Sequence, residues 1–179
     1  MIVRVSGGKI SWDGPPNTNG ADGYGVTSSA PCALGRSGVV PEADKREGDG
    51  ATPVGVWRLM TGFYRADRVV APDGPLDMRA VGPLDLWSDD PDDSAYNHAV
   101  RAPYRPSHER LRRGDGLYDI VLVSDWNWPD AVPGRGSAIF VHCWRGPRKP
   151  TAGCLAFRPD HLRWILARWT PRSRVVVRG

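Results

Sequence analysis

Short runs of β-branched and aromatic residues, bounded by turn residues, are the clearest hydrophobic pattern in this chain. Two of them, residues 117–123 and 137–143, predict well-defined strands. Shorter runs of the same kind predict strands over residues 2–5, 9–12 and 174–178. Gly, Pro and Asn residues over positions 13–20 predict a turn-rich connection after the second of these strands.

A further strand and one helix complete the pattern. Val54, Val56 and Leu59 nearly alternate with other residues, so a strand is expected over 53–59, entered from the polar segment 41–52. The helix is predicted from Pro159 for about three turns, up to Thr170 and Pro171. Its apolar positions follow helical spacing and are Leu162, Ile165, Leu166 and Trp169.

Residues 72–116 are dominated by acids, prolines and glycines, with one possible short helix over 107–113. Such a stretch predicts a long excursion over the surface. Loops of this length in compact domains are usually functional or disordered, so this one is a candidate lid. With 179 residues the whole chain, 1–179, is expected to be one domain, mainly β with one clear α-helix and long loops.

Composition narrows the class of protein. Apolar residues make up 40% of the chain, too many for a disordered protein, yet their runs are far too short for a membrane span. The first residues resemble no secretory leader. Three cysteines, Cys32, Cys143 and Cys154, cannot all pair and form no CxxC motif, which argues against a disulfide scaffold or a zinc ribbon. No metal or cofactor is expected.

Charge is distributed unevenly between the two parts of the chain. Residues 135–179 hold ten Arg or Lys and one acid, while residues 1–134 hold 14 basic and 19 acidic residues. The C-terminal quarter is therefore strongly basic. It could attract nucleic acid, an anionic cell-wall polymer or a carboxylate-rich substrate, and charge alone does not choose among them.

The segment from His142 to Cys154 is the candidate for chemistry. Side chains alternate along a strand, so His142 should share a face with Phe140, whereas Cys143 should point into the core. Cys154 is then the candidate nucleophile. The nearby cations Arg145, Arg148 and Lys149 are expected to favour its thiolate. Backbone N–H groups around Gly153 and Cys154 could stabilise an oxyanion.

Several motifs together resemble the L,D-transpeptidase (YkuD-like) family. They are a strand-borne His142, the sequence Thr151-Ala152-Gly153-Cys154, and an upstream Thr52-Pro53-Val54-Gly55. Residues 45–53, Tyr96-Asn97 and 134–140 resemble a divergent branch of small, stand-alone catalytic domains. The resemblance implies a β-sandwich-like catalytic fold, as a monomer.

The resemblance also implies a reaction. Cys154 would attack an L-to-D peptide bond of a peptidoglycan stem, and His142 would carry the proton. An amine acceptor gives a 3→3 or 1→3 cross-link, whereas water gives an L,D-carboxypeptidase. Carbapenems would acylate the same thiol. Stem peptides, rather than nucleic acid, are the expected partners, and the cell envelope is the expected location, with the cytoplasm as the alternative. A non-enzymatic polyanion-binding module is the remaining alternative.

The chain departs from the family pattern beside both key residues. Cys143 stands where the family has Gly after the His, and Ala156 where it has an Arg after the Cys. Candidates for that missing cation are Arg135, Arg145, Arg148 and Arg158. Other expected substrate contacts are Tyr96, Asn97, Trp144 and Thr151. Residues 135–159 contain no carboxylate, so a backbone carbonyl is the simplest group to orient His142.

Overall fold

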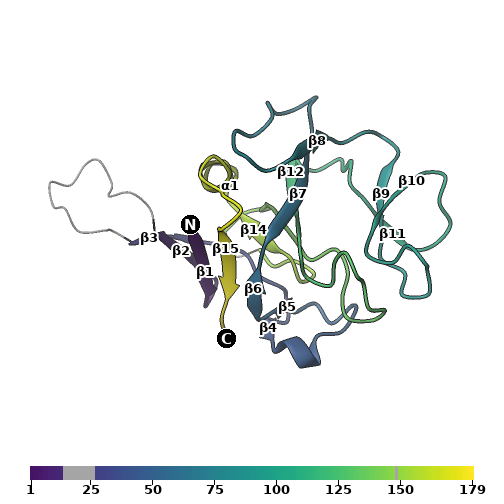
Figure 1. The fold of residues 1–179 in the computed structure, drawn as a ribbon, viewed down its shortest axis with the longest axis horizontal. Coiled ribbons are helices and arrows are strands. Elements are labelled where there is room, and N and C mark those ends of the chain that lie inside the picture. Colours follow the sequence, from purple (N-terminus) through teal and green to yellow (C-terminus); the bar gives the residue numbers. More distant parts are fainter. Residues whose placement is uncertain (14–26, 148) are drawn as a thin grey trace, which may run out of the picture.

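The computed structural model describes residues 1–13, 27–147 and 149–179 (Figure 1). Strands dominate it, joined by one α-helix, α1 (Pro159–Leu166), and a short 3-10 helix at Glu42–Asp44. The predicted turns over 13–20 lie outside the described residues, apart from residue 13. None of the helices in the described part of the chain is long and apolar enough to cross a membrane.

The first five-stranded sheet unites the two ends of the chain. Its order is β3-β2-β1-β15-β6, and the predicted N-terminal and C-terminal strands are confirmed in it. β1 and β15 pair in parallel, with Val3 opposite Val175. The strand bounds are β1 (Ile2–Ser6), β2 (Lys9–Asp13), β3 (Thr27–Pro31), β15 (Arg174–Val177) and β6 (Gly55–Trp57).

The strand predicted over 53–59 is divided among three sheets, so that prediction was too simple. β5 (Thr52–Pro53) pairs with β4 (Val39–Val40), β6 belongs to the first sheet, and β7 (Leu59–Tyr64) belongs to the second. The break between β6 and β7 falls at Arg58, whose backbone N–H donates to Asp125 Oδ1 at 2.8 Å instead of to a neighbouring strand.

The second five-stranded sheet carries both strongly predicted strands. Its order is β14-β13-β12-β7-β8, with bounds β14 (Leu155–Phe157), β13 (Phe140–Cys143), β12 (Ile120–Ser124) and β8 (Met78–Ala80). β13 begins three residues later than predicted, because Ala138 adopts a left-handed φ of 50° and the Phe140 N–H bonds back to the Ala138 carbonyl. A tight turn therefore precedes the strand.

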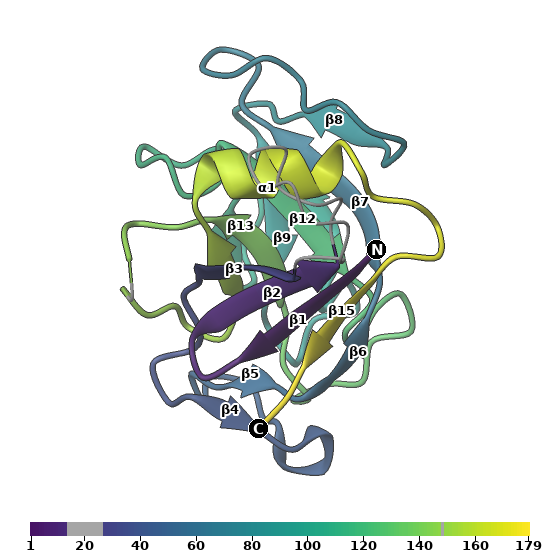
Figure 2. The same cartoon turned by 90° about the vertical axis from the view of Figure 1, so that its left-hand side faces the viewer.

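The two large sheets pack face to face, which confirms the sandwich-like fold. One core cluster joins Val3 and Val175 of the first sheet, Leu122 and Val141 of the second, and the buried face of α1. Figure 2 shows α1 in front of β12 and β13, beside the first sheet. The helix is shorter than predicted, since Trp169 N–H bonds to Leu166 O in a tighter turn, yet Trp169 still reaches the core.

The excursion over 72–116 is folded rather than looped. β9 (Asp85–Ser88) pairs with β10 (Ala99–Arg101) and β11 (His108–Arg110) in a small sheet, which Figure 1 places on the opposite side of the second sheet from β1 and β2. The helix predicted over 107–113 was wrong, because pairing with β9 and burial of Leu111 override local preference. That this segment moves as a lid stays a prediction.

Candidate active site

Two cavities meet at Cys154. The first has a volume of about 300 Å³, and its wall includes Cys154, His142, Tyr118 and Thr151. The second, of about 180 Å³, is lined by the cysteine together with residues of the 36–48 segment and of the 137–139 turn. The structure thus brings together the predicted thiol and imidazole, and it adds a second space that also borders the thiol.

Strand alternation delivers His142 to this site as predicted. Phe140 and Cys154 belong to the cluster between the second sheet and the small sheet, whereas Val141 and Cys143 belong to the sandwich core. Burial raises the pKa of Cys143 to about 11 and that of Cys32, in the same core, to about 12. All three cysteines are free thiols, and Cys154 is the one that lines a cavity described above.

The loop before β14 holds Cys154 through its own neighbours. Thr151 Oγ1 donates to Cys154 O at 2.7 Å and accepts from Gly153 N–H at 3.1 Å. Gly153 has a φ of +143°, and a Cβ there would lie 3.0 Å from Ala51 O, so only glycine fits without strain. Thr151 and Gly153 therefore shape the loop, and the Gly153 N–H is already engaged.

The sulfur of Cys154 rests against the turn before β13. Its thiol donates to Ala138 O at 3.1 Å, and it accepts from Phe140 N–H at 3.4 Å. Asn97 fixes this turn, because its Oδ1 accepts from Ala138 N–H at 2.9 Å. The Asn97 side chain is buried and lies outside both cavities, so the structure gives it a supporting position rather than the predicted contact with substrate.

His142 is oriented by a backbone carbonyl, as the lack of a local carboxylate predicted. Its Nδ1 lies 2.8 Å from Cys143 O, which can only accept, so the neutral ring carries its proton on Nδ1 and leaves Nε2 as the base. The Tyr118 ring packs edge-on against the imidazole, with 5.2 Å between centroids. Burial lowers the pKa of His142 to about 4, so the ring is neutral at pH 7.

The thiol is neutral as well, which corrects the expected thiolate. Burial and the carboxylate of Glu109 raise the pKa of Cys154 to about 12, outweighing the Phe140 N–H, Lys45 and Arg113, which lower it. Of the three loop cations expected to do this, Arg145 and Lys149 are exposed and Arg148 lies outside the described residues. Desolvation therefore dominates over the cations of the loop.

Thiol and imidazole are neighbours on one face of the sheet but are not hydrogen-bonded to each other. β13 and β14 pair in parallel with His142 opposite Ala156, so Cys154 lies two positions along the same face. Diagonal neighbours of this kind on adjacent strands have Cα atoms about 7–8 Å apart. This arrangement suits proton transfer between two neutral groups.

Residues that sequence analysis missed complete the site. The excursion over 72–116 contributes Glu109 and Arg113. The start of the predicted strand 117–123 contributes Tyr118, and the segment before β5 contributes Arg36 and Lys45. Tyr118 O–H donates to Glu109 Oε2 at 2.5 Å. The pairing of β9 with β11 brings Glu109 to the site, and no local sequence pattern predicts this pairing.

Three further predicted substrate residues lie away from both cavities. Tyr96 is buried and donates its hydroxyl to Glu47. Arg135 forms an ion pair with Glu42 at 3.3 Å and lines a separate cavity of about 190 Å³ beside Trp126. Trp144 is half-buried, and its backbone N–H donates to Phe157 O. Of the predicted cations, Arg145 lines the first cavity, whereas Arg158 is exposed and pairs with Asp160.

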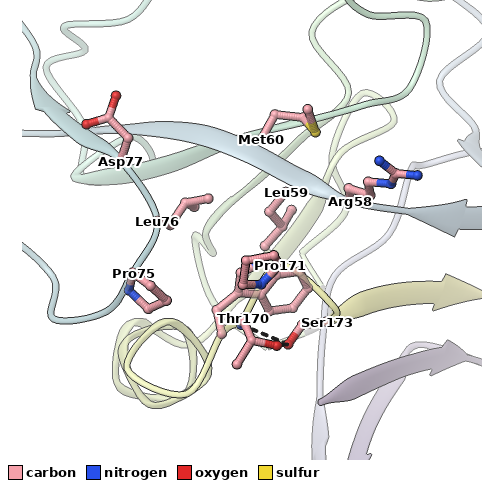
Figure 3. A pocket seen from close by; sticks show the side chains of 10 residues that line it. Arg58, Leu59, Met60, Pro75, Leu76, Asp77, Thr170, Pro171 and Ser173 are labelled. Atoms are coloured by element: carbon pink, nitrogen blue, oxygen red, sulfur yellow. Dashed lines mark hydrogen bonds between the residues drawn. The ribbon is translucent and has the colours of Figure 1, made fainter.

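A larger cavity, of about 390 Å³, opens elsewhere on the molecule (Figure 3). Leu59, Leu76 and Pro171 give it apolar walls, while Arg58 and Asp77 supply charges. Thr170 and Ser173 are hydrogen-bonded to each other at its edge. Its lining contains no cysteine or histidine, so its size does not make it the candidate for covalent chemistry.

Comparison with known proteins agrees with the geometry around Cys154. Searches against curated proteins and against solved structures gave no match. The family described as the L,D-transpeptidase catalytic domain (YkuD) matches residues 18–177, nearly the whole chain. A match of that extent, over a chain that brings a cysteine and a histidine to one cavity, shows that this protein belongs to the L,D-transpeptidase catalytic domain family.

Proposed function

We propose that this protein is a peptidoglycan L,D-transpeptidase that cross-links stem peptides through an acyl-enzyme on Cys154. The family to which it belongs is one of acyltransferases with a cysteine nucleophile. The observation that carries the proposal is the meeting of Cys154 and His142 in one cavity wall. Stem peptides are components of the cell envelope, so the activity would be exercised there.

Acylation would proceed from two neutral groups. As the Cys154 sulfur attacks the carbonyl carbon of the L-to-D peptide bond, its proton passes to His142 Nε2. Collapse of the tetrahedral intermediate breaks the C–N bond, and the imidazolium returns the proton to the departing amine of the D-residue. The carbonyl of Cys143 holds the ring in place throughout, because it accepts from Nδ1.

Cations around the first cavity support binding of a carboxylate-rich donor stem. Arg36, Arg113, Arg145 and Lys149 line it, against one acid, Glu109. The family's Arg near the nucleophile is replaced by Ala156, which is buried and pairs with His142 across β13 and β14. Arg36 and Arg113 would supply that charge from other elements of the fold.

The proposal is tested with a purified disaccharide-tetrapeptide as both donor and acceptor. Cys154→Ala should abolish the cross-linked dimer, measured by mass spectrometry, while the matched control Cys143→Ala, which removes a thiol from the sandwich core, should retain it. Release of a disaccharide-tripeptide without dimer would assign the protein as an L,D-carboxypeptidase instead. Dimer formation by Cys154→Ala would refute the proposal.

A further inference from the structure

Glu109 occupies the wall that the two cavities share. It lies on β11 in the small sheet, and both cavities count it among their lining residues together with Cys154. A carboxylate in that position can contact groups bound in either cavity. The mechanism of acylation given above makes no use of it.

The carboxylate of Glu109 is held in place by a hydrogen bond. Its Oε2 accepts from Tyr118 O–H, and Tyr118 in turn packs against the His142 ring. It forms no ion pair with any Lys or Arg of the described residues. Burial raises the pKa of Glu109 and outweighs the Tyr118 hydrogen bond and the charge of Arg113, which lower it, so Glu109 accepts a proton more readily than an exposed glutamate.

The two cavities differ in charge. The first is cationic, as described above, whereas the second holds three acids, Glu47, Asp89 and Glu109, with Arg36 and Lys45. Lys45 is already engaged, since its Nζ bonds to Asp49 Oδ1 at 2.6 Å and to Arg46 O at 2.8 Å. Asp89 Oδ1 is buried without a hydrogen-bond partner among the described residues. The second cavity therefore suits a cationic group.

We propose that Glu109 receives the ammonium group of the acceptor stem in the second cavity and takes one proton from it before the nitrogen attacks the acyl-enzyme. The inference rests on the proposed function, because it needs an acyl group on Cys154. It assigns the ammonium group of the acceptor a place, the second cavity, and a base, Glu109.

Proton balance explains why an amine needs a second base. An ammonium that becomes an amide nitrogen loses two protons: Glu109 takes the first, giving the free amine. The amine then forms the new C–N bond, and His142 Nε2 takes the second proton and delivers it to the departing Cys154 sulfur as the C–S bond breaks. Glu109 releases its proton to solvent with the product. Water loses only one proton on the way to a carboxylic acid, so hydrolysis needs His142 alone.

The test compares the two fates of one acyl-enzyme. Wild type and Glu109→Gln are acylated at Cys154 with the donor stem, and cross-linked and hydrolysed products are counted by mass spectrometry. Loss of a general base typically costs about 10²–10⁴ in rate, so we expect the ratio of aminolysis to hydrolysis to fall at least tenfold. Both products come from the same acyl-enzyme, so their ratio does not depend on the rate of acylation, which Glu109→Gln can change because the Glu109 carboxylate raises the pKa of Cys154.

Two controls make the result specific. Glu42→Gln makes the same change at an exposed carboxylate outside both cavities, and should leave the ratio unchanged. Hydroxylamine is neutral at pH 7 and needs no proton removed before attack, so with it as acceptor the defect of Glu109→Gln should largely disappear.

An unchanged ratio in Glu109→Gln overturns the inference, and so does an equal defect with hydroxylamine. If Glu109→Gln does not fold or acylate, Tyr118→Phe removes only the hydroxyl that holds the carboxylate. It should then lower the ratio, and an unchanged ratio would overturn the inference in the same way. Absence of any acyl group on wild-type Cys154 would instead contradict the proposed function, so the two failures are distinguishable.

Discussion

Asn97 offers the most demanding test of how the fold supports the nucleophile. Its side chain is 2% exposed, and Oδ1 accepts from both Trp87 Nε1 and Ala138 N–H at 2.9 Å. Its Nδ2 donates to Asn127 O at 2.6 Å. We predict that Asn97→Ala destabilises the protein and loosens the turn on which the Cys154 thiol rests.

The magnitude follows from the groups left without partners. Two donors, Trp87 Nε1 and Ala138 N–H, would be buried and unsatisfied, and each costs about 1–3 kcal/mol. Asn97 also has a left-handed φ of 58°, which costs alanine about 1 kcal/mol more than asparagine. Together these effects predict a loss of about 3–7 kcal/mol in the free energy of unfolding, a large part of the stability of an ordinary domain.

Urea denaturation of the purified protein measures this loss, and alkylation of Cys154 by iodoacetamide measures exposure of the thiol. Tyr96→Phe is the matched control at the neighbouring residue, because it removes a single hydroxyl bonded to the Glu47 carboxylate and should cost about 1.5–3 kcal/mol. A loss in Asn97→Ala no larger than in Tyr96→Phe, with unchanged alkylation, would show that Asn97 does not support the site.

Two other predictions concern the pH response and the small sheet. The pKa of His142 is lowered from 6.5 to about 4 in the folded protein, so between pH 6.5 and 4 the unfolded chain binds more protons than the folded one. The free energy of unfolding should therefore fall as the pH drops from 6.5 to 4. Urea denaturation of the wild type at several pH values should show this fall, and His142→Gln should show less of it. Leu111 is fully buried against the second sheet, so Leu111→Ala should cost about 2–5 kcal/mol in the same assay. A cost under about 1 kcal/mol would mean that the excursion does not share that core.

Local patterns predicted those parts of the molecule in which burial follows sequence spacing. Alternation placed His142 and Cys143 on the correct faces of β13, and helical spacing identified the buried positions of α1. The absence of a carboxylate near His142 pointed to a carbonyl partner, which is Cys143 O. These features depend on neighbours a few residues apart.

Features set by distant pairing escaped prediction. Glu109 lies beside Cys154 because β11 pairs with β9. Residues 107–113 have no hydrophobic pattern that predicts a strand. The ionisation of Cys154 was predicted from nearby charges in the sequence, yet burial by the small sheet and by Phe140 governs it. Desolvation is a property of the whole fold, so counting charges along a loop cannot reveal it.

Acylation of Cys154 can be measured by the intact mass of the protein after exposure to a carbapenem. We expect one covalent adduct per chain, mapped by peptide mass to Cys154 and absent from Cys154→Ala. No adduct on the wild-type protein, or an adduct on Cys32 or Cys143, would contradict this expectation.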